Sequence, residues 1–149
     1  MTRLEAEWPG APGVHTRSHE RHKPGEEAAV SQQPQGSLAV RVRQVEAGLR
    51  RVLQPILDEQ GLAMDHWRII AVIGDEPGLT MSEIATAAVV PAASLTRHVD
   101  RLVAQGIVVR RIDPDDRRRA VAALSPHGAA YADRLRAAER SVEIGRAHV

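Results

Sequence analysis

The chain has 149 residues, 43% of them hydrophobic and 26% charged, which is the size and composition of one globular domain. Its formal net charge is only +1, so any binding of nucleic acid must depend on where the arginines lie. The absence of cysteine excludes disulfides, thiolate zinc sites and cysteine redox switches. No apolar run is long enough to span a membrane, and the N-terminus has no secretory pattern, so we expect a cytoplasmic protein.

Residues 1–37 mix proline, glycine, glutamine and charged residues with almost no apolar periodicity. Such a segment buries too little apolar surface to offset its ordering entropy, and we predict a disordered tail. It contains His15, His19 and His22. A metal site needs a fixed geometry that this tail does not supply, so we predict solvated histidines and no bound metal.

From Leu38 onward apolar residues recur every three or four positions, which predicts an amphipathic helix that ends by Gly61. Pro55 is expected to kink or weaken it. A second helix is expected from Asp65, its N-cap, to about Gly74. The side chains predicted to face the core are Leu38, Val42, Val45, Leu49, Leu53 and Ile56 in the first helix and Trp67, Ile70 and Ile73 in the second.

Residues 80–83, with the sequence Thr-Met-Ser-Glu, form a capping box that opens a short helix. Val90-Pro91 ends it, and a further helix is expected from about Ala92 to Gln105, with Gly106 as a left-handed stop. Two short helices separated by a tight break are typical of a helix-turn-helix. Their predicted inward side chains are Ile84, Ala87, Ala88, Leu95, Val99, Leu102 and Val103.

Beyond Gly106 the pattern predicts a β-hairpin, with strands over residues 107–112 and 120–124 and a turn at residues 113–116. Ser125-Pro126 then opens a final helix. One side of that helix is predicted to hold Ala129, Ala132, Leu135 and Ala138, and the hairpin tip carries Arg117, Arg118 and Arg119. This order of elements predicts a mainly α fold with a small β-wing, the winged helix-turn-helix.

The placement of the arginines points to DNA. In a helix-turn-helix the second helix lies in the major groove and its first residues meet the base edges. Those positions hold Ala92, Ala93, Ser94, Thr96, Arg97 and His98. Residues 91–119 contain seven arginines against four aspartates, so the positive charge is concentrated there. Three consecutive arginines at a hairpin tip suit insertion into a narrow minor groove.

Other interpretations must be weighed against DNA binding. A winged helix that binds only proteins would have an apolar recognition helix, and Ser94, Thr96 and Arg97 argue against it. The wing aspartates lack the glycine and distal glutamate of a calcium loop. No catalytic constellation or glycine-rich phosphate loop is present, so we expect no enzyme and no cofactor. Trp67 on the second helix is more typical of a core residue than of a ligand platform.

Several segments resemble the MarR (multiple antibiotic resistance regulator) family, over roughly residues 38–140. These segments are Gly61–Trp67, Leu79–Ala85, Leu95–Leu102, Gln105–Val108 and, most specifically, Asp113–Arg119 running on to Leu124–Gly128. The resemblance implies a homodimeric regulator, often a repressor of a neighbouring transporter or detoxification operon. Each protomer would place its recognition helix in half of a near-palindromic site and its wing arginine in the adjacent minor groove.

Carried over by position, the resemblance assigns roles to individual residues. The major-groove contacts would be Ser94, Thr96, Arg97 and His98, and the wing contact would be Arg118, helped by Arg117 and Arg119. Asp116 would hold the wing in shape. Many family members release DNA when a small, often phenolic ligand enters a crevice, which Trp67 and the first helix would border here.

The C-terminal part departs from this pattern. Family members pair through the N-terminal helix and two C-terminal helices, whereas this chain ends during or just after the first of those two. We therefore expect residues 38–143 to hold the winged helix with partial dimerisation helices. Residues 144–149 lack helical patterning and resemble the translation of a sequencing adapter, so we expect a non-native tail.

Overall fold

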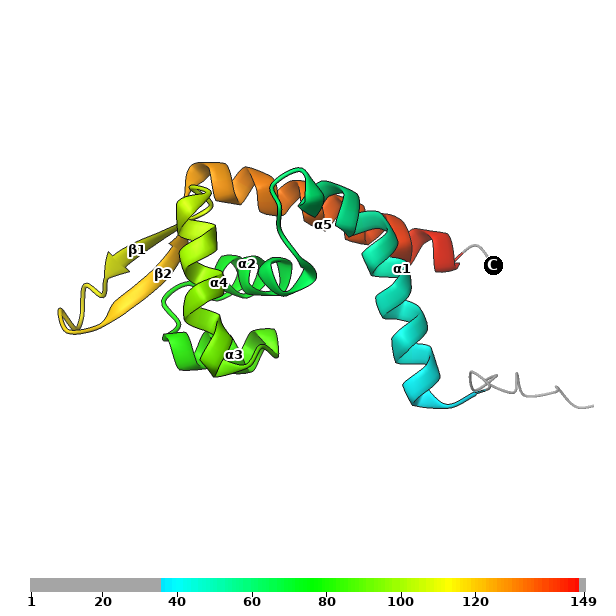
Figure 1. Ribbon diagram of the computed structural model, residues 1–149, viewed down its shortest axis with the longest axis horizontal. Helices are drawn as coiled ribbons and strands as arrows, with labels where there is room; N and C mark the ends of the chain where they lie inside the picture. The colour runs from blue at the N-terminus through cyan, green and yellow to red at the C-terminus, as the bar shows by residue number, and fades with distance from the viewer. Residues whose placement is uncertain (1–35, 148–149) are drawn as a thin grey trace, which may run out of the picture. The chain divides into compact units, whose positions relative to one another are not determined.

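The computed structural model describes residues 36–147, with side chains up to residue 142 (Figure 1). The predicted N-terminal tail and its three histidines lie outside this range, apart from Gly36 and Ser37. The elements are α1 (Leu38–Asp58), α2 (Met64–Asp75), α3 (Met81–Ala88), α4 (Ala92–Ala104), β1 (Val108–Ile112), β2 (Ala120–Leu124) and α5 (Pro126–Ala147). This order confirms the predicted fold, a mainly α domain with a two-stranded wing. None of the helices described is long and apolar enough to cross a membrane.

Helix α1 is buried only in its C-terminal half. Leu53 and Leu57 are fully buried, because α2 and α5 pack against this part of the helix. Leu38 and Val42 lie in the N-terminal half and are 67% and 56% exposed. The prediction that they face the core of this chain is therefore wrong. Pro55 lies inside α1, and the helix continues past it to Asp58.

Helix α2 begins at a different residue from the one predicted. Its N-cap is Ala63, and the Nδ1 atom of His66 accepts a hydrogen bond from the Ala63 backbone N–H at 2.9 Å. Asp65 lies in the first turn and forms an ion pair with Arg68, so its prediction as N-cap is wrong. The imidazole three residues after the cap satisfies the N–H that a capping-box glutamate would otherwise bind.

Helices α3 and α4 form the predicted helix-turn-helix. The Thr80 hydroxyl accepts from the Glu83 N–H at 3.2 Å, and the Glu83 carboxylate accepts from the Thr80 N–H at 2.7 Å, which confirms the capping box. Helix α3 ends at Val89, whose φ of 54° is left-handed and therefore strained for a β-branched residue. Ala87 and Val103 are exposed, so two predicted inward positions are wrong, and Ala85 is buried instead.

The wing and α5 follow as predicted. Strands β1 and β2 are antiparallel, with Val108 opposite Leu124 and Ile112 opposite Ala120. The Ser125 hydroxyl caps α5 by accepting from the Gly128 N–H at 2.9 Å. The buried residues of the predicted face are Ala132 and Leu135, with Ala138 half-buried, whereas Ala129 is exposed and Tyr131 is buried in addition.

Helix α5 continues to Ala147, so the absence of helix predicted for residues 144–147 is wrong. The backbone of this segment simply extends the helix that Ser125 begins. Whether residues 144–149 are native stays a prediction.

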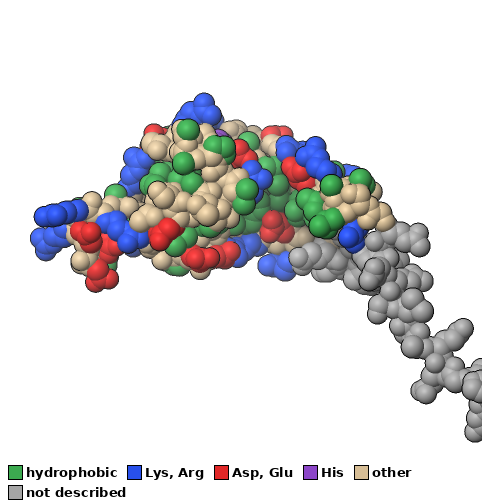
Figure 2. All heavy atoms as spheres, turned by 90° about the horizontal axis from the view of Figure 1, so that it is seen from below, with side chains coloured by type: hydrophobic (Ala, Val, Ile, Leu, Met, Phe, Trp, Pro, Cys, Tyr) green, Lys and Arg blue, Asp and Glu red, His purple; other side chains and the backbone are tan. Residues whose placement is uncertain are grey.

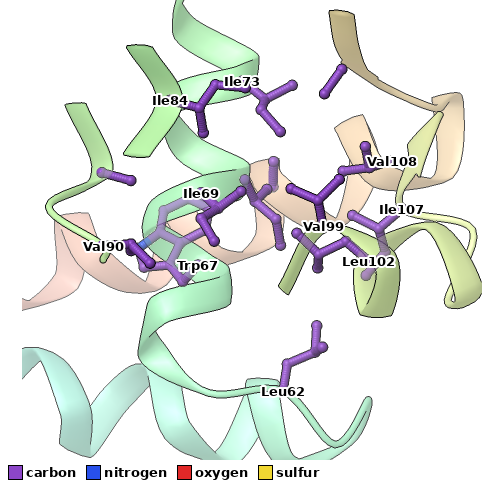
Figure 3. Packing of buried hydrophobic residues seen from close by; sticks show 14 of the residues in the cluster. Leu62, Trp67, Ile69, Ile73, Ile84, Val90, Val99, Leu102, Ile107 and Val108 are labelled. Carbon is purple, nitrogen blue, oxygen red and sulfur yellow. The ribbon is translucent and has the colours of Figure 1, made fainter. Parts of the chain in front are cut away.

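One hydrophobic core holds α2, α3, α4 and the base of the wing together (Figure 3). Ile69, Ile84, Val99 and Ile107 come from four different elements or their ends, and each is at most 1% exposed. Full burial of an aliphatic side chain of this size stabilises a fold by about 1.5–3 kcal/mol. The core therefore fixes α4 and the hairpin relative to each other.

Candidate nucleic-acid interface

Helix α4 exposes one face at its N-terminal end. Leu95 and Val99 are buried in the core, and the intervening Thr96 and Arg97 are exposed. Ser94 is half-buried, and its hydroxyl donates to the Pro91 carbonyl at 3.0 Å, within the first turn. Thr96 and Arg97 are thus the two predicted major-groove residues that are exposed.

The structure places His98 on another side of α4. Its side chain is 14% exposed, and its Nδ1 atom lies 3.2 Å from Nε2 of His66 on α2. The ring therefore packs into the interface between α2 and α4, away from Thr96 and Arg97. This placement does not support the predicted contact of His98 with DNA.

The hairpin lies beside α4 (Figure 1). A shallow hollow of about 200 Å³ separates them, lined by Met81, Thr96, Arg110, Ala120, Val121 and Ala122. Arg110 on β1 also forms an ion pair with Asp100 on α4. Because Thr96 faces a hollow shared with the hairpin, the exposed end of α4 and the wing belong to one surface.

The seven arginines of this region divide into two groups. Arg110 pairs with Asp100, and Arg119 pairs with Glu83 and Asp113. Arg101 donates to the Gly61 carbonyl at 3.3 Å. The other four are all exposed and enter no ion pair within residues 36–142: Arg97, Arg111, Arg117 and Arg118. Figure 2 shows basic side chains at the end of the molecule where the hairpin projects.

Arg119 is bound within the protein. Its Nη2 atom donates to the Gly78 carbonyl at 3.1 Å and to the Glu83 carboxylate at 3.3 Å, and its Nε atom lies 3.7 Å from Asp113 Oδ2. Gly78 and Glu83 flank the start of α3, so Arg119 ties the wing to the helix-turn-helix. The structure does not place it with Arg117 and Arg118.

Two aspartates shape the turn of the wing. Asp116 Oδ1 accepts from the Arg118 N–H at 3.0 Å, and the Asp116 carbonyl accepts from the Arg119 N–H at 2.9 Å. Asp113 Oδ1 accepts from the Asp115 N–H at 2.9 Å. Aspartate side chains commonly stabilise turns in this way. Asp116 is therefore in a position to orient the wing, as the sequence predicts.

A pocket of about 500 Å³ opens on another part of the domain, between α1, α2 and the end of α3. Figure 2 shows apolar side chains gathered in the centre of this face. Trp67 lines the pocket but is only 3% exposed, and its Nε1–H donates to Glu139 on α5 at 2.7 Å. Trp67 is thus a core residue, as expected, and it also borders the pocket, while its contact with a ligand stays a prediction.

The comparisons with known proteins agree with this geometry. The family model described as the MarR family matches residues 60–119, which run from the α1–α2 loop to Arg119, just before β2. Residues 60–119 of this chain thus match the winged helix of the MarR family. Wild-type MarR from E. coli in its apo form has 26% sequence identity and a TM-score of 0.59, with 68% of this chain and 75% of that chain covered. NadR in complex with 4-hydroxyphenylacetate has 25% identity and a TM-score of 0.63, with coverage of 80% and 86%.

Curated relatives are named as regulators. The homoprotocatechuate degradative operon repressor of Escherichia coli is 26% identical over 98 residues, or 66% of each protein. The regulator FarR of Neisseria gonorrhoeae is 29% identical over 98 residues, or 66% of this chain and 67% of its own length. A regulatory protein assigned to the hcr operon of Thauera aromatica is 32% identical over 82 residues, 55% of this chain and only 49% of its own length.

The sequence did not predict three features of this winged helix. Arg111 is exposed on β1 without an ion pair within the described residues, and its place among the seven arginines of residues 91–119 was the signal for it. Glu139 at the pocket wall lies 72 residues from Trp67, and no local signal relates the two. The third is the hydrogen bond from Arg119 to Glu83, because Glu83 is 36 residues away.

His66, which lies between α2 and α4, makes stability depend on pH. His66 Nδ1 accepts from Ala63, so in neutral His66 the proton is on Nε2 and is donated to His98. Burial holds the pKa of His66 below its usual value of 6.5, and His98 and Arg101 act in the same direction, opposed by Asp65.

We expect the free energy of unfolding to fall as the pH drops below about 6.5. In that range His66 binds a proton in the unfolded chain more readily than in the folded protein. Urea denaturation at about pH 7.5 and about pH 5.5 measures this loss. His66→Gln keeps an acceptor for the Ala63 N–H but does not titrate, so it should flatten the dependence. The pKa values of Glu59 and Glu83 are lowered from 4.5, and their contributions are lost only at lower pH. If the free energy of unfolding of His66→Gln depended on pH as steeply as that of the wild type, His66 would not be the group responsible.

Proposed function

We propose that this chain is the DNA-binding part of a transcriptional regulator, a repressor that recognises a near-palindromic operator in duplex DNA. The observation that carries the proposal is the surface shared by α4 and the wing, with its four arginines that enter no ion pair within residues 36–142. The relatives are named as regulators and repressors, and we propose no catalytic role.

In this proposal α4 lies in the major groove, and Thr96 and Arg97 approach the base edges. Arginine can donate to both acceptors of guanine, and threonine to phosphates or bases. The hairpin extends beyond α4, so Arg117 and Arg118 reach the adjacent minor groove, where the negative potential is strongest. Arg111 on β1 supports these contacts from the side of the strand.

We further propose that two copies of the protein bind the operator together. The N-terminal half of α1 supports this, because Leu38, Val40 and Val42 are all more than half exposed. A second copy would cover these side chains. Pairing also serves affinity, since one DNA-binding module alone buries only about 600–1,000 Å².

A small molecule would relieve repression by entering the pocket beside Trp67. The pocket lies between α1, which we assign to pairing, and the end of α3, which precedes the recognition helix. A ligand there can change how α1 sits against the helix-turn-helix. The solved relative NadR, in complex with 4-hydroxyphenylacetate, supports a small effector in this proposal.

A salt titration of duplex binding tests the function. We expect the logarithm of the affinity for a duplex of about 30 base pairs to fall linearly with the logarithm of the salt concentration, by roughly 0.9 for each phosphate contact. Fluorescence anisotropy with a labelled duplex from about 50 to about 200 mM salt measures the slope. Absence of binding at the lowest salt would rule out the proposal and favour the alternative, a winged helix that binds proteins only.

A further inference from the structure

The pocket between α1 and α2 has three charged side chains in its wall, and two of them are neutralised by neighbours. Glu46 accepts from Arg43 at 2.8 Å and lies 3.8 Å from Arg50, one turn further along α1. Arg68 forms an ion pair with Asp65. Neither Glu46 nor Arg68 is therefore available to balance a charged ligand without losing an existing partner.

The third charged side chain in the wall is Glu139, and it has different partners. Its Oε1 atom accepts from the Trp67 indole N–H at 2.7 Å, which is a neutral donor, and no ion pair within residues 36–142 includes Glu139. Arg136, three residues earlier on the same helix, pairs with Asp75 instead. Half-buried Glu139 thus brings an unbalanced negative charge to the wall of the pocket.

The rest of the wall strengthens the effect of this charge. Val42, Leu49, Met64 and Val72 are among the lining residues, and an apolar wall screens a charge less than water does. The Glu139 carboxylate would repel an aromatic acid bound here. The Trp67 N–H already donates to Glu139 and is therefore not free to bind the acid. A cation would gain an ion pair with Glu139 instead.

We infer that the ligand of this pocket is a small organic cation, an ammonium group on an apolar aromatic body, and that Glu139 selects for it. This inference rests on the proposed function only in taking the pocket as the effector site. It assigns to the ligand a positive charge, opposite to that of an aromatic acid. Glu139 is then the residue that determines specificity, while the apolar wall contributes affinity for the body of the ligand.

Three probes with the same ring and different charge test the inference: 4-chlorobenzylamine, 4-chlorobenzyl alcohol and 4-chlorophenylacetate. The full chain is used with Trp8→Phe, which leaves Trp67 as the sole tryptophan, so its fluorescence reports binding at the pocket. We expect the amine to bind at least about tenfold more tightly than the acid, with the alcohol between them.

Two matched variants locate the cause. Glu139→Gln keeps an acceptor for the Trp67 N–H and should bring the amine and the acid to within about threefold of each other, with the alcohol unchanged. Glu46→Gln removes the same charge from the same pocket, but from a residue that Arg43 already neutralises, and should retain the preference. Thermal unfolding checks that both variants fold.

Three outcomes would overturn the inference: equal or tighter binding of the acid, a preference that survives Glu139→Gln, or no binding of any probe. Duplex binding is measured on the same protein in parallel. A preference for the amine without duplex binding would refute the proposed regulator and leave the ligand class standing. Duplex binding without the preference would refute the ligand class alone.

Discussion

Gly128→Ala is expected to destabilise the domain by at least about 3 kcal/mol, or to prevent folding altogether. A Cβ atom at Gly128 would lie 2.0 Å from the Ile107 carbonyl oxygen and 2.8 Å from its carbon. Both atoms belong to the backbone, and the same carbonyl accepts from the Ser125 N–H at 3.0 Å. The clash therefore cannot be relieved by a side-chain rotation. It would separate the first turn of α5 from the segment that joins α4 to β1.

Gly48→Ala is the matched control. Gly48 lies within α1, and its Cβ would make an ordinary contact with Val142 Cγ1 at 3.7 Å. Alanine should raise the free energy of unfolding there, by up to about 1 kcal/mol, because glycine is unfavourable inside a helix. Urea denaturation followed by circular dichroism compares both variants with the wild type. A Gly128→Ala protein as stable as the wild type would show that α5 does not begin against Ile107.

Arg118→Ala is expected to weaken operator binding by about 1–3 kcal/mol while leaving the fold intact. The side chain is exposed and has no ion pair within residues 36–142, so its loss costs no intramolecular contact of this kind. Its backbone N–H remains bound to Asp116, which keeps the wing in shape. If the guanidinium contacts phosphate in the minor groove, the salt dependence of binding should also fall by about one unit of slope.

Arg134→Ala removes the same charge from α5, where the guanidinium pairs with Glu59 at 2.6 Å. Exposed pairs of this kind contribute little to stability, and this variant should bind DNA as the wild type does. Anisotropy titrations of both variants at one salt concentration make the comparison. An equal loss in the two would mean that only overall charge matters, and an unchanged Arg118→Ala would remove the wing from the interface.

Local sequence determined the elements of this protein. The capping box at Thr80 and Glu83, the left-handed Gly106 and the Ser125 cap all act within a few residues, and the structure has each of them. The errors at this level are small and have local causes. At the start of α2, for example, a histidine takes the capping role and Asp65 is displaced into the first turn.

Only the tertiary structure decided which charged and polar side chains remain free. Arg118 and Arg119 are neighbours with the same chemistry, yet Arg119 is bound to Glu83 on α3 and Arg118 is exposed. His98 follows Arg97 directly but turns toward His66, which is 32 residues away. Such partners are set by how the helices and the hairpin pack around the core. A pattern that repeats over a few residues can place a side chain on a helix or a turn, but it carries no information about what the opposite element presents.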